Sequence, residues 1–117
     1  MEENVKRLGS NRFQDDPILT GILHRLVEAF QPERIYLFGS KARLDENKDS
    51  DYDLMIVVPD NAPPEKRRSR LAYQVLRGTR VATDVLVLSR QAFESRLHLK
   101  ASLPATVIRE GVLLYAS

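Results

Sequence analysis

Three aspartates in the middle of the chain have the side-chain chemistry that binds divalent cations. Asp51 and Asp53 stand two residues apart in Ser-Asp-Tyr-Asp-Leu, residues 50–54, where a polar loop enters an apolar run. Residues two apart in a strand face the same side, about 6.6 Å from each other along the chain, so both carboxylates should point at one place. Asp84 stands in a later apolar run and could complete the cluster. Carboxylates in such an arrangement can bridge two metal ions about 4 Å apart.

The electrostatic cost of the cluster favours a cation site. Two carboxylates about 5 Å apart, at an effective dielectric constant of about 20, repel by about 3 kcal/mol, so three together are expensive unless cations balance them. An alternative stays open, in which Asp51 caps the loop, Asp53 is solvated at the strand start and Asp84 pairs with an arginine. Taken alone, an Asp-x-Asp at a strand edge favours this alternative, because aspartate is common at turns.

A second motif, Gly39-Ser40-Lys41-Ala42-Arg43, directly follows an apolar run. Glycine permits close approach of the backbone to phosphate, and free amide groups at a helix start can cradle an anion together with the Ser40 hydroxyl. Arg43, one helical turn after Gly39, can return toward the same place, to a phosphate or to the carboxylates. On its own, the Gly39-Ser40 pair is more typical of an ordinary turn and helix cap.

Apolar patterns predict the strands and the first helix that would position these residues. Asp16 followed by Pro17 indicates a helix start, and apolar residues at helical spacing continue to Phe30, before Pro32. Both faces of the apolar run at residues 81–88 are largely apolar, which predicts a central strand. The runs that predict strands are 35–38, 52–58, 81–88 and 112–115.

Later segments predict three further helices. One has Leu71 and Ala72 on its buried side and arginines on the other, and Gly78 closes it. Ser89 and Ser102 are each expected to cap another helix. The alternation of helices and strands predicts a small α/β domain.

Composition is that of one ordinary globular domain. The chain has 117 residues, 43% hydrophobic and 29% charged, which leaves room for a single domain. Cysteine is absent and the polar start contains no apolar stretch, so we expect neither disulfides nor a signal peptide or membrane span. We therefore expect a polar arm at residues 1–14, the α/β domain at 15–117, and a cytoplasmic location without membrane contact.

Charge is balanced overall and uneven locally. The 18 basic and 16 acidic side chains leave a net charge of +2, too small to indicate a nucleic-acid binder. The segment from Lys66 to Arg80 holds six basic residues and no acidic one, whereas residues 45–53 hold five acidic ones. The basic segment could contact nucleic acid or an acidic partner, but a solvated helix face is favoured, so direct nucleic-acid binding is not expected.

Together the two motifs resemble the nucleotidyltransferase superfamily that includes DNA polymerase beta, and particularly its small members, the minimal nucleotidyltransferases. The family pattern is an apolar strand, Gly-Ser-x-Ala-Arg, Ser-Asp-x-Asp-Leu after about a dozen residues, and an acidic residue on a later strand. This chain has Tyr36-Leu37-Phe38-Gly39-Ser40-Lys41-Ala42-Arg43, then Ser50-Asp51-Tyr52-Asp53-Leu54, then Thr83-Asp84-Val85. The resemblance implies a small mixed β-sheet flanked by helices, the polymerase beta-like fold.

The resemblance also implies roles for the site residues. Asp51 and Asp53 would bind two Mg²⁺ ions, while Asp84 would bind one and help to deprotonate an acceptor hydroxyl. Gly39 and Ser40 would hold the β- and γ-phosphates of ATP or another nucleoside triphosphate, with Arg43 as a further nucleotide-binding residue. Such catalysis rests on positioning and charge neutralisation at an in-line displacement.

Two functions are compatible with these residues. Small relatives act as antitoxins beside a helical ribonuclease-type protein, so the resemblance implies an antitoxin of a HEPN/MNT toxin–antitoxin pair. This chain would move AMP from ATP onto a hydroxyl of the helical HEPN-type toxin. The alternative is a non-catalytic module that binds nucleotide or neutralises a toxin by occupying it.

Overall fold

The computed structural model describes residues 16–39, 52–79 and 81–117, and within them the chain forms one four-stranded mixed sheet. The strand order is β3-β2-β1-β4. β1 is antiparallel to β2 and to β4, whereas β2 and β3 are parallel. The small mixed sheet flanked by helices is therefore confirmed. The strands are β1 (Arg34–Phe38), β2 (Tyr52–Val58), β3 (Thr83–Ser89) and β4 (Val112–Ala116).

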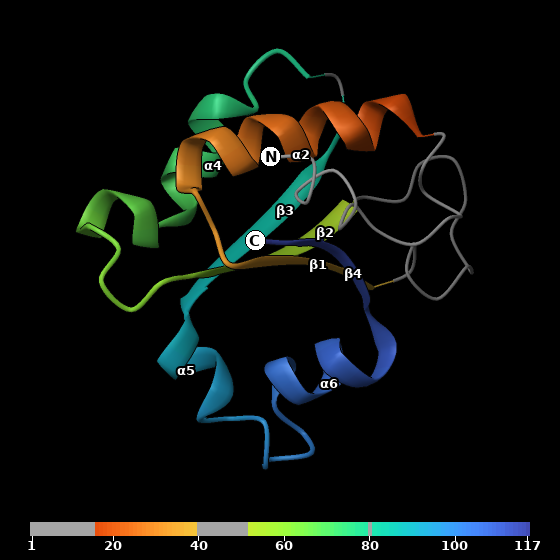
Figure 1. The fold of residues 1–117 in the computed structure, drawn as a ribbon. Helices are drawn as coiled ribbons and strands as arrows, with labels where there is room; N and C mark the ends of the chain where they lie inside the picture. The colour runs from red at the N-terminus through yellow and green to blue at the C-terminus, as the bar shows by residue number, and fades with distance from the viewer. Residues whose placement is uncertain (1–15, 40–51, 80) are drawn as a thin grey trace.

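Helices cover both faces of the sheet (Figure 1). On one face lie α2 (Pro17–Phe30) and α4 (Ser69–Val75), the latter preceded by the short 3-10 helix η2 (Pro64–Arg67). On the other face lie α5 (Arg90–Glu94) and α6 (Leu103–Glu110). No helix in the part of the chain that the structure describes is long and apolar enough to cross a bilayer.

The first helix begins and ends where the sequence predicts. The carboxylate of Asp16 accepts a hydrogen bond from the Leu19 amide at 3.0 Å, and Pro17 occupies the first turn. Gln31 caps the other end in the left-handed conformation, with φ 48°, immediately before Pro32. The predicted caps of α5 and α6 are also present, because the Ser89 and Ser102 hydroxyls accept amide hydrogen bonds of 3.1 and 3.2 Å.

Alternation along β2 divides the core between the two faces. Leu54, Ile56 and Val58 are buried against α2 in the larger cluster. Met55 and Val57 face the other way, toward a smaller cluster. There the rings of Tyr36 and Phe93 stack with centroids 5.6 Å apart, which holds α5 against β1. Because successive residues of β2 alternate between the faces, Asp53 lies on the α5 and α6 side with Met55.

The prediction of a central third strand is wrong. Among the strands that the structure describes, β3 is outermost and pairs with β2 alone, and it begins at Thr83 and not at Val81. Val85 is buried against α2 and α4, but Leu86 on the opposite face is 45% exposed. The apolar residues on both faces of β3 therefore do not indicate a central position, because one face is covered and the other is partly exposed.

Two shorter corrections concern the helices. The basic segment forms η2 and α4 and not one continuous helix, and α4 ends at Val75, before the turn that contains Gly78. The helix that Ser89 caps is short, because α5 ends at Glu94 and Leu97 lies in the turn after it. The predicted polar arm, residues 1–14, lies outside the described residues.

Candidate active site

Asp53 and Asp84 occupy paired positions in neighbouring strands. In the parallel register of β2 and β3, the α-carbon of Asp53 lies opposite that of Asp84. Neighbouring strands are about 4.8 Å apart, and paired residues project from the same face of a sheet. Asp53 is half-buried and Asp84 is exposed. Two carboxylates, distant in the sequence, therefore share one place on the surface.

Gly39 brings the end of β1 against the same place. Its φ is +79°, the left-handed conformation that favours glycine. A β-carbon at this position would overlap the Oδ2 atom of Asp53 and would lie 3.2 Å from its Cγ. The absence of a side chain at Gly39 is thus what lets the backbone approach the Asp53 carboxylate closely.

The strand pairs arrange the sheet face near the aspartates in two rows. Phe38 lies opposite Asp53 on β1, so the first row reads Asp84, Asp53, Phe38. The next row, two residues further along each strand, reads Leu86 on β3, Met55 on β2, Tyr36 on β1 and Leu113 on β4. In this second row the two central side chains are buried and both outer leucines are exposed.

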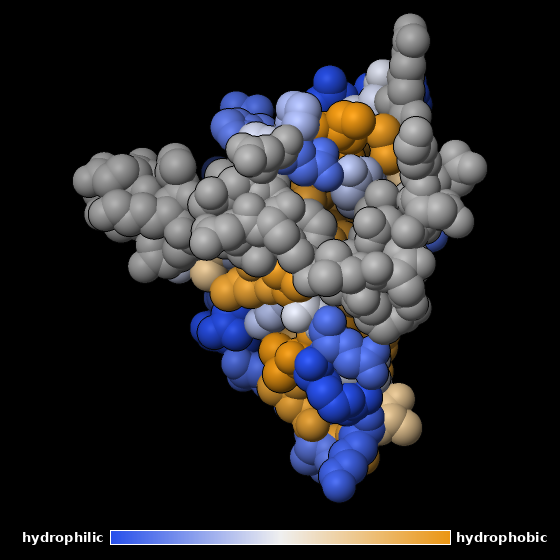
Figure 2. Space-filling model, turned by 90° about the vertical axis from the view of Figure 1, so that its right-hand side faces the viewer, coloured by the Kyte–Doolittle hydropathy of each residue, from blue (hydrophilic) through white to orange (hydrophobic). Residues whose placement is uncertain are grey.

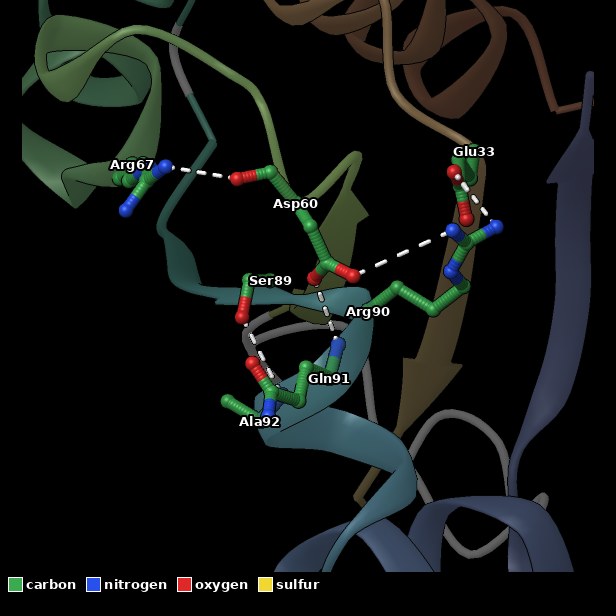
Figure 3. Close-up of polar contacts among 7 residues, drawn as sticks. All are labelled: Glu33, Asp60, Arg67, Ser89, Arg90, Gln91 and Ala92. Carbon is green, nitrogen blue, oxygen red and sulfur yellow. Dashed lines mark hydrogen bonds and ion pairs between the residues drawn. The ribbon is translucent and has the colours of Figure 1, made fainter.

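A polar cluster fixes α5 at the other end of β2 and β3 (Figure 3). The carboxylate of Asp60 accepts the Gln91 amide at 2.8 Å and lies 3.9 Å from the Arg90 guanidinium. Arg90 also pairs with Glu33, at 3.3 Å, and Arg67 donates to the Asp60 carbonyl oxygen at 2.7 Å. These bonds tie α5 to the carboxyl-terminal end of β2, so α5 leaves the amino-terminal corner with the aspartates uncovered.

The ion pairs of the described residues do not include Asp84. The alternative in which Asp84 pairs with an arginine is therefore not supported within that part of the chain. Two carboxylates at about 5 Å repel by about 3 kcal/mol at an effective dielectric constant of about 20. A pair of carboxylates of this kind, one half-buried and one exposed, is suited to a divalent cation, which prefers carboxylate oxygens.

The other predicted site residues are not described. Ser40, Arg43 and Asp51 lie outside the described residues, as does the predicted polar loop from residue 45 to residue 50. Among the described residues, no group of three or more acidic, histidine or cysteine side chains could hold a metal ion. The described part of the candidate site therefore consists of Gly39, Asp53 and Asp84.

A second contact at the start of β2 was not predicted from the sequence. Tyr52 stands between the two aspartates and faces the larger core cluster, on the opposite side of the sheet from Asp53. Its hydroxyl donates a 2.8 Å hydrogen bond to the Asp16 carboxylate, whose other oxygen caps α2. Burial, followed by this hydrogen bond, raises the pKa of Tyr52 above its ordinary value of 10.0. Strict alternation places Tyr52 in the core, but its partner depends on how α2 packs.

Two cavities are lined by described residues at the other end of the sheet from the aspartates. One of about 200 Å³ is lined by Glu33, Arg34 and Arg90 together with Leu97 and Ile108, beside the carboxyl-terminal end of β2. A wider hollow is lined by Asp60 and α5. Neither of these two cavities is lined by Asp53 or Asp84.

One protein family matches most of this chain. Residues 21–117 match the model of the polymerase beta nucleotidyltransferase family, and the matched region contains every candidate site residue. The chain belongs to this family. No match was found among the curated proteins.

Solved structures share the polymerase beta-like fold. A protein from Sulfolobus solfataricus assigned as a nucleotidyltransferase is 24% identical, with a TM-score of 0.57 over 85% of this chain and 78% of that chain. A toxin–antitoxin structure with AMP-PNP is 22% identical, with a TM-score of 0.54 over 83% of this chain and 73% of that one. A mutant of the MntA–HpeT toxin–antitoxin is 18% identical, with a TM-score of 0.52 and the same coverage.

Proposed function

We propose that this protein is a Mg²⁺-dependent nucleotidyltransferase that moves AMP from ATP onto a hydroxyl of a partner protein. The observation that carries the proposal is the pairing of Asp53 with Asp84, with the Gly39 backbone against the Asp53 carboxylate. These residues occupy the family motifs in a chain that belongs to the nucleotidyltransferase family. In this proposal residues 15–117 form the catalytic domain. The protein would act in the cytoplasm, where its substrate ATP is present.

The donor set fits divalent metal. Asp53 and Asp84 supply carboxylate oxygens from one face, and the lack of a side chain at Gly39 leaves room for the Asp53 carboxylate. Asp51, two residues before Asp53, would supply the third carboxylate. Two bound Mg²⁺ ions would neutralise the phosphates and hold the α-phosphate for in-line attack.

The chain's own residues divide the remaining work. Gly39 amide, Ser40 hydroxyl and Arg43 would hold the β- and γ-phosphates. Asp84, exposed at the sheet corner, would accept the proton of the acceptor hydroxyl. The acceptor oxygen forms a bond to the α-phosphorus, the bond from this phosphorus to the bridging oxygen breaks, and pyrophosphate leaves.

A protein acceptor is favoured by the size of the domain and by the structural neighbours. In a domain of this size α5 packs on β2 and β3 and α6 packs on β1, which leaves little further protein with which to bind a second substrate. Two of the similar solved structures are toxin–antitoxin structures, one of them with AMP-PNP. We therefore propose a helical HEPN-type toxin as the acceptor and this chain as its antitoxin.

Labelled nucleotide tests the proposal. The purified protein is incubated with Mg²⁺, each α-labelled triphosphate in turn and a lysate of the native cell, alongside Asp53→Asn, Asp84→Asn and the control Asp60→Asn. We expect one protein band labelled from ATP by the wild type and by Asp60→Asn only. Nucleotide binding without any labelled acceptor would instead assign a non-catalytic binding module.

A further inference from the structure

Leu86 is an exposed leucine beside the paired aspartates. It follows Asp84 by two residues on the same face of β3, about 7 Å further along the strand. Its side chain is 45% exposed, although its row neighbour Met55 is buried. An apolar side chain at the open corner of the sheet can be covered by whatever approaches Asp84 from the edge.

Tyr73 lies on the opposite side of the same edge. It projects from α4, is 48% exposed, and its hydroxyl accepts a 3.3 Å hydrogen bond from the Val85 amide. In a parallel ladder alternate residues bond to one neighbour, and the Tyr52 amide bonds to the Ala82 carbonyl oxygen. The amide of Val85 therefore points away from β2, and Tyr73 occupies it.

This hydrogen bond decides how a partner could dock. An unpaired edge strand is a template for strand addition, and proteins protect such edges. Tyr73 covers the middle of the β3 edge, so contact here has to be made through side chains. The two exposed side chains that flank the edge, Tyr73 and Leu86, are the apolar anchors available for that contact.

Charge indicates the chemistry of the partner. The sequence from Lys66 to Thr83 contains no acidic residue. Arg70, three residues before Tyr73 on α4, lies on the same side of the helix and is exposed, and Arg77 is exposed in the turn after it. Among described residues, neither guanidinium has a hydrogen-bonding or ion-pair partner. Both are therefore available to carboxylates of another protein.

The geometry points to the β3 edge, formed by Tyr73, Leu86, Arg70 and Arg77, as the docking surface for the acceptor protein. The occupant is an acidic segment of that protein with an apolar or aromatic side chain next to the acceptor hydroxyl. Leu86 and Tyr73 would contact the apolar side chain, and the arginines would contact the acids. This inference rests on the proposed function, because it assigns the acceptor side of the same site.

A second group of exposed apolar side chains does not serve this purpose. Leu97 and Ile108 line the cavity near Arg90, at the other end of β2 from Asp53. At the end of the molecule formed by α5 and α6, hydrophobic atoms show only between hydrophilic ones (Figure 2). A partner bound there would not bring its hydroxyl to Asp84.

Binding of a defined acidic polypeptide tests the surface without turnover. The probe is a fluorescent random copolymer of glutamate and tyrosine, compared with a lysine–tyrosine copolymer and single-stranded oligo(U), each titrated with the wild-type protein. We expect binding of the glutamate copolymer only, weakening steeply with salt because arginines make the contact. Equal binding of the two copolymers, or preferred binding of oligo(U), would overturn the inference.

Matched variants localise the contact. Leu86→Ala and Arg70→Glu should each weaken copolymer binding about five- to tenfold, a typical loss for an anchor residue. Leu113→Ala and Arg96→Glu are the controls, since Leu113 is 40% exposed in the same row at the other edge and Arg96 is an exposed arginine near α5. Equal losses in variant and control would overturn the inference.

The proposed function has a separate readout in the same samples. Nucleotidyl transfer to the tyrosines of the glutamate copolymer is measured with labelled ATP and Mg²⁺, and Asp53→Asn should abolish it while leaving copolymer binding intact. Binding without transfer would contradict the proposed activity and would still support the docking surface. Transfer that is insensitive to Leu86→Ala and Arg70→Glu would contradict the docking surface and keep the activity.

Discussion

The α-carbon of Gly39 lies against the carboxylate of Asp53, with no room between them for a side chain. Gly39 directly follows β1 in the left-handed conformation, and Asp53 is the second residue of β2. Gly39 and Asp53, one from each family motif, are thereby held in close contact. A phosphate bound at Gly39 would therefore lie next to a metal ion bound at Asp53.

A comparison of Gly39→Ala with Gly78→Ala should distinguish the effect of the close contact with Asp53 from the effect of backbone strain. Both glycines have positive φ, +79° and +93°, so an added β-carbon costs about 1–2 kcal/mol of strain at either position. Nothing lies within 4 Å of a β-carbon at Gly78, whereas at Gly39 it overlaps Asp53. Urea unfolding should show a larger loss of stability for Gly39→Ala, and calorimetry a loss of Mg²⁺–ATP binding in that variant alone. Matching losses in both measurements would remove the close-approach argument.

Tyr52→Phe should destabilise the fold by about 1–2 kcal/mol at pH 7, because it removes a hydroxyl that donates to a carboxylate. The ring stays in the core, so the cooperativity of unfolding should be unchanged. Asp16→Asn is the companion variant, since its amide oxygen can still cap α2 while the charge is lost. Urea denaturation measures both, and a Tyr52→Phe protein as stable as the wild type would contradict the contact.

The same contact predicts a loss of stability in alkali. The pKa of Tyr52 is raised in the folded state above its ordinary value of 10.0, so the unfolded chain loses this proton first. The stabilisation from Tyr52 is therefore complete below about pH 10 and declines as the pH rises above it. Between pH 9 and about 11.5, the free energy of unfolding should fall more steeply in the wild type than in Tyr52→Phe. Parallel curves would contradict the raised pKa.

Asp60 should stabilise α5 through its hydrogen bond and not through its charge. Exposed ion pairs contribute about 0–1 kcal/mol, whereas loss of a helix cap costs about 1 kcal/mol. Asp60→Asn keeps an oxygen for the Gln91 amide and should be nearly as stable as the wild type at high salt. Asp60→Ala should lose about 1 kcal/mol at any salt concentration. Thermal melting at two salt concentrations distinguishes them, and equal losses would assign the effect to the ion pair with Arg90.

Local patterns predicted most elements because local chemistry determines them. Asp16 and Pro17 mark the start of α2 by capping alone, and Ser89 and Ser102 do the same for α5 and α6. The sequence also placed Asp53 and Asp84 on different strands. The nucleotidyltransferase resemblance supplied their adjacency, and the register of β2 and β3 bears it out.

Features that depend on packing between distant segments were not predictable from local sequence. β3 has the apolar pattern of a central strand, but its edge position follows from which strands pair. The hydrogen bond of Tyr52 to Asp16 and that of Tyr73 to Val85 both need the placement of a helix on the sheet. Gly39 was predicted to approach phosphate, and its contact with Asp53 appears only in the folded chain.

Ser40→Ala should weaken nucleotide binding more than it weakens metal binding, because in the proposed function it deletes a hydroxyl that would bind the phosphates and leaves the carboxylates intact. Calorimetric titration with Mg²⁺ alone and with Mg²⁺–ATP separates the two affinities. Equal ATP affinity in the wild type and in Ser40→Ala would favour the alternative that Gly39-Ser40 is an ordinary turn without a phosphate-binding role.

Metal should stabilise the fold through the paired aspartates. Without metal, Asp53→Asn and Asp84→Asn should melt at or above the wild-type temperature, since each removes carboxylate repulsion. With Mg²⁺ and nucleotide, the wild type and the control Asp60→Asn should gain stability, while the two site variants should gain less. The same midpoint shift in all four proteins would contradict a metal site at Asp53 and Asp84.

The intact mass of a co-purified partner tests nucleotidyl transfer most directly. The protein is isolated from its native cell with any bound partner, and the partner is weighed before and after addition of ATP and Mg²⁺. We expect the partner's mass to increase by one AMP with the wild type and to stay unchanged with Asp53→Asn or Asp84→Asn. A stable complex whose partner mass never changes, with wild-type protein and added ATP and Mg²⁺, would contradict transfer and leave neutralisation by binding.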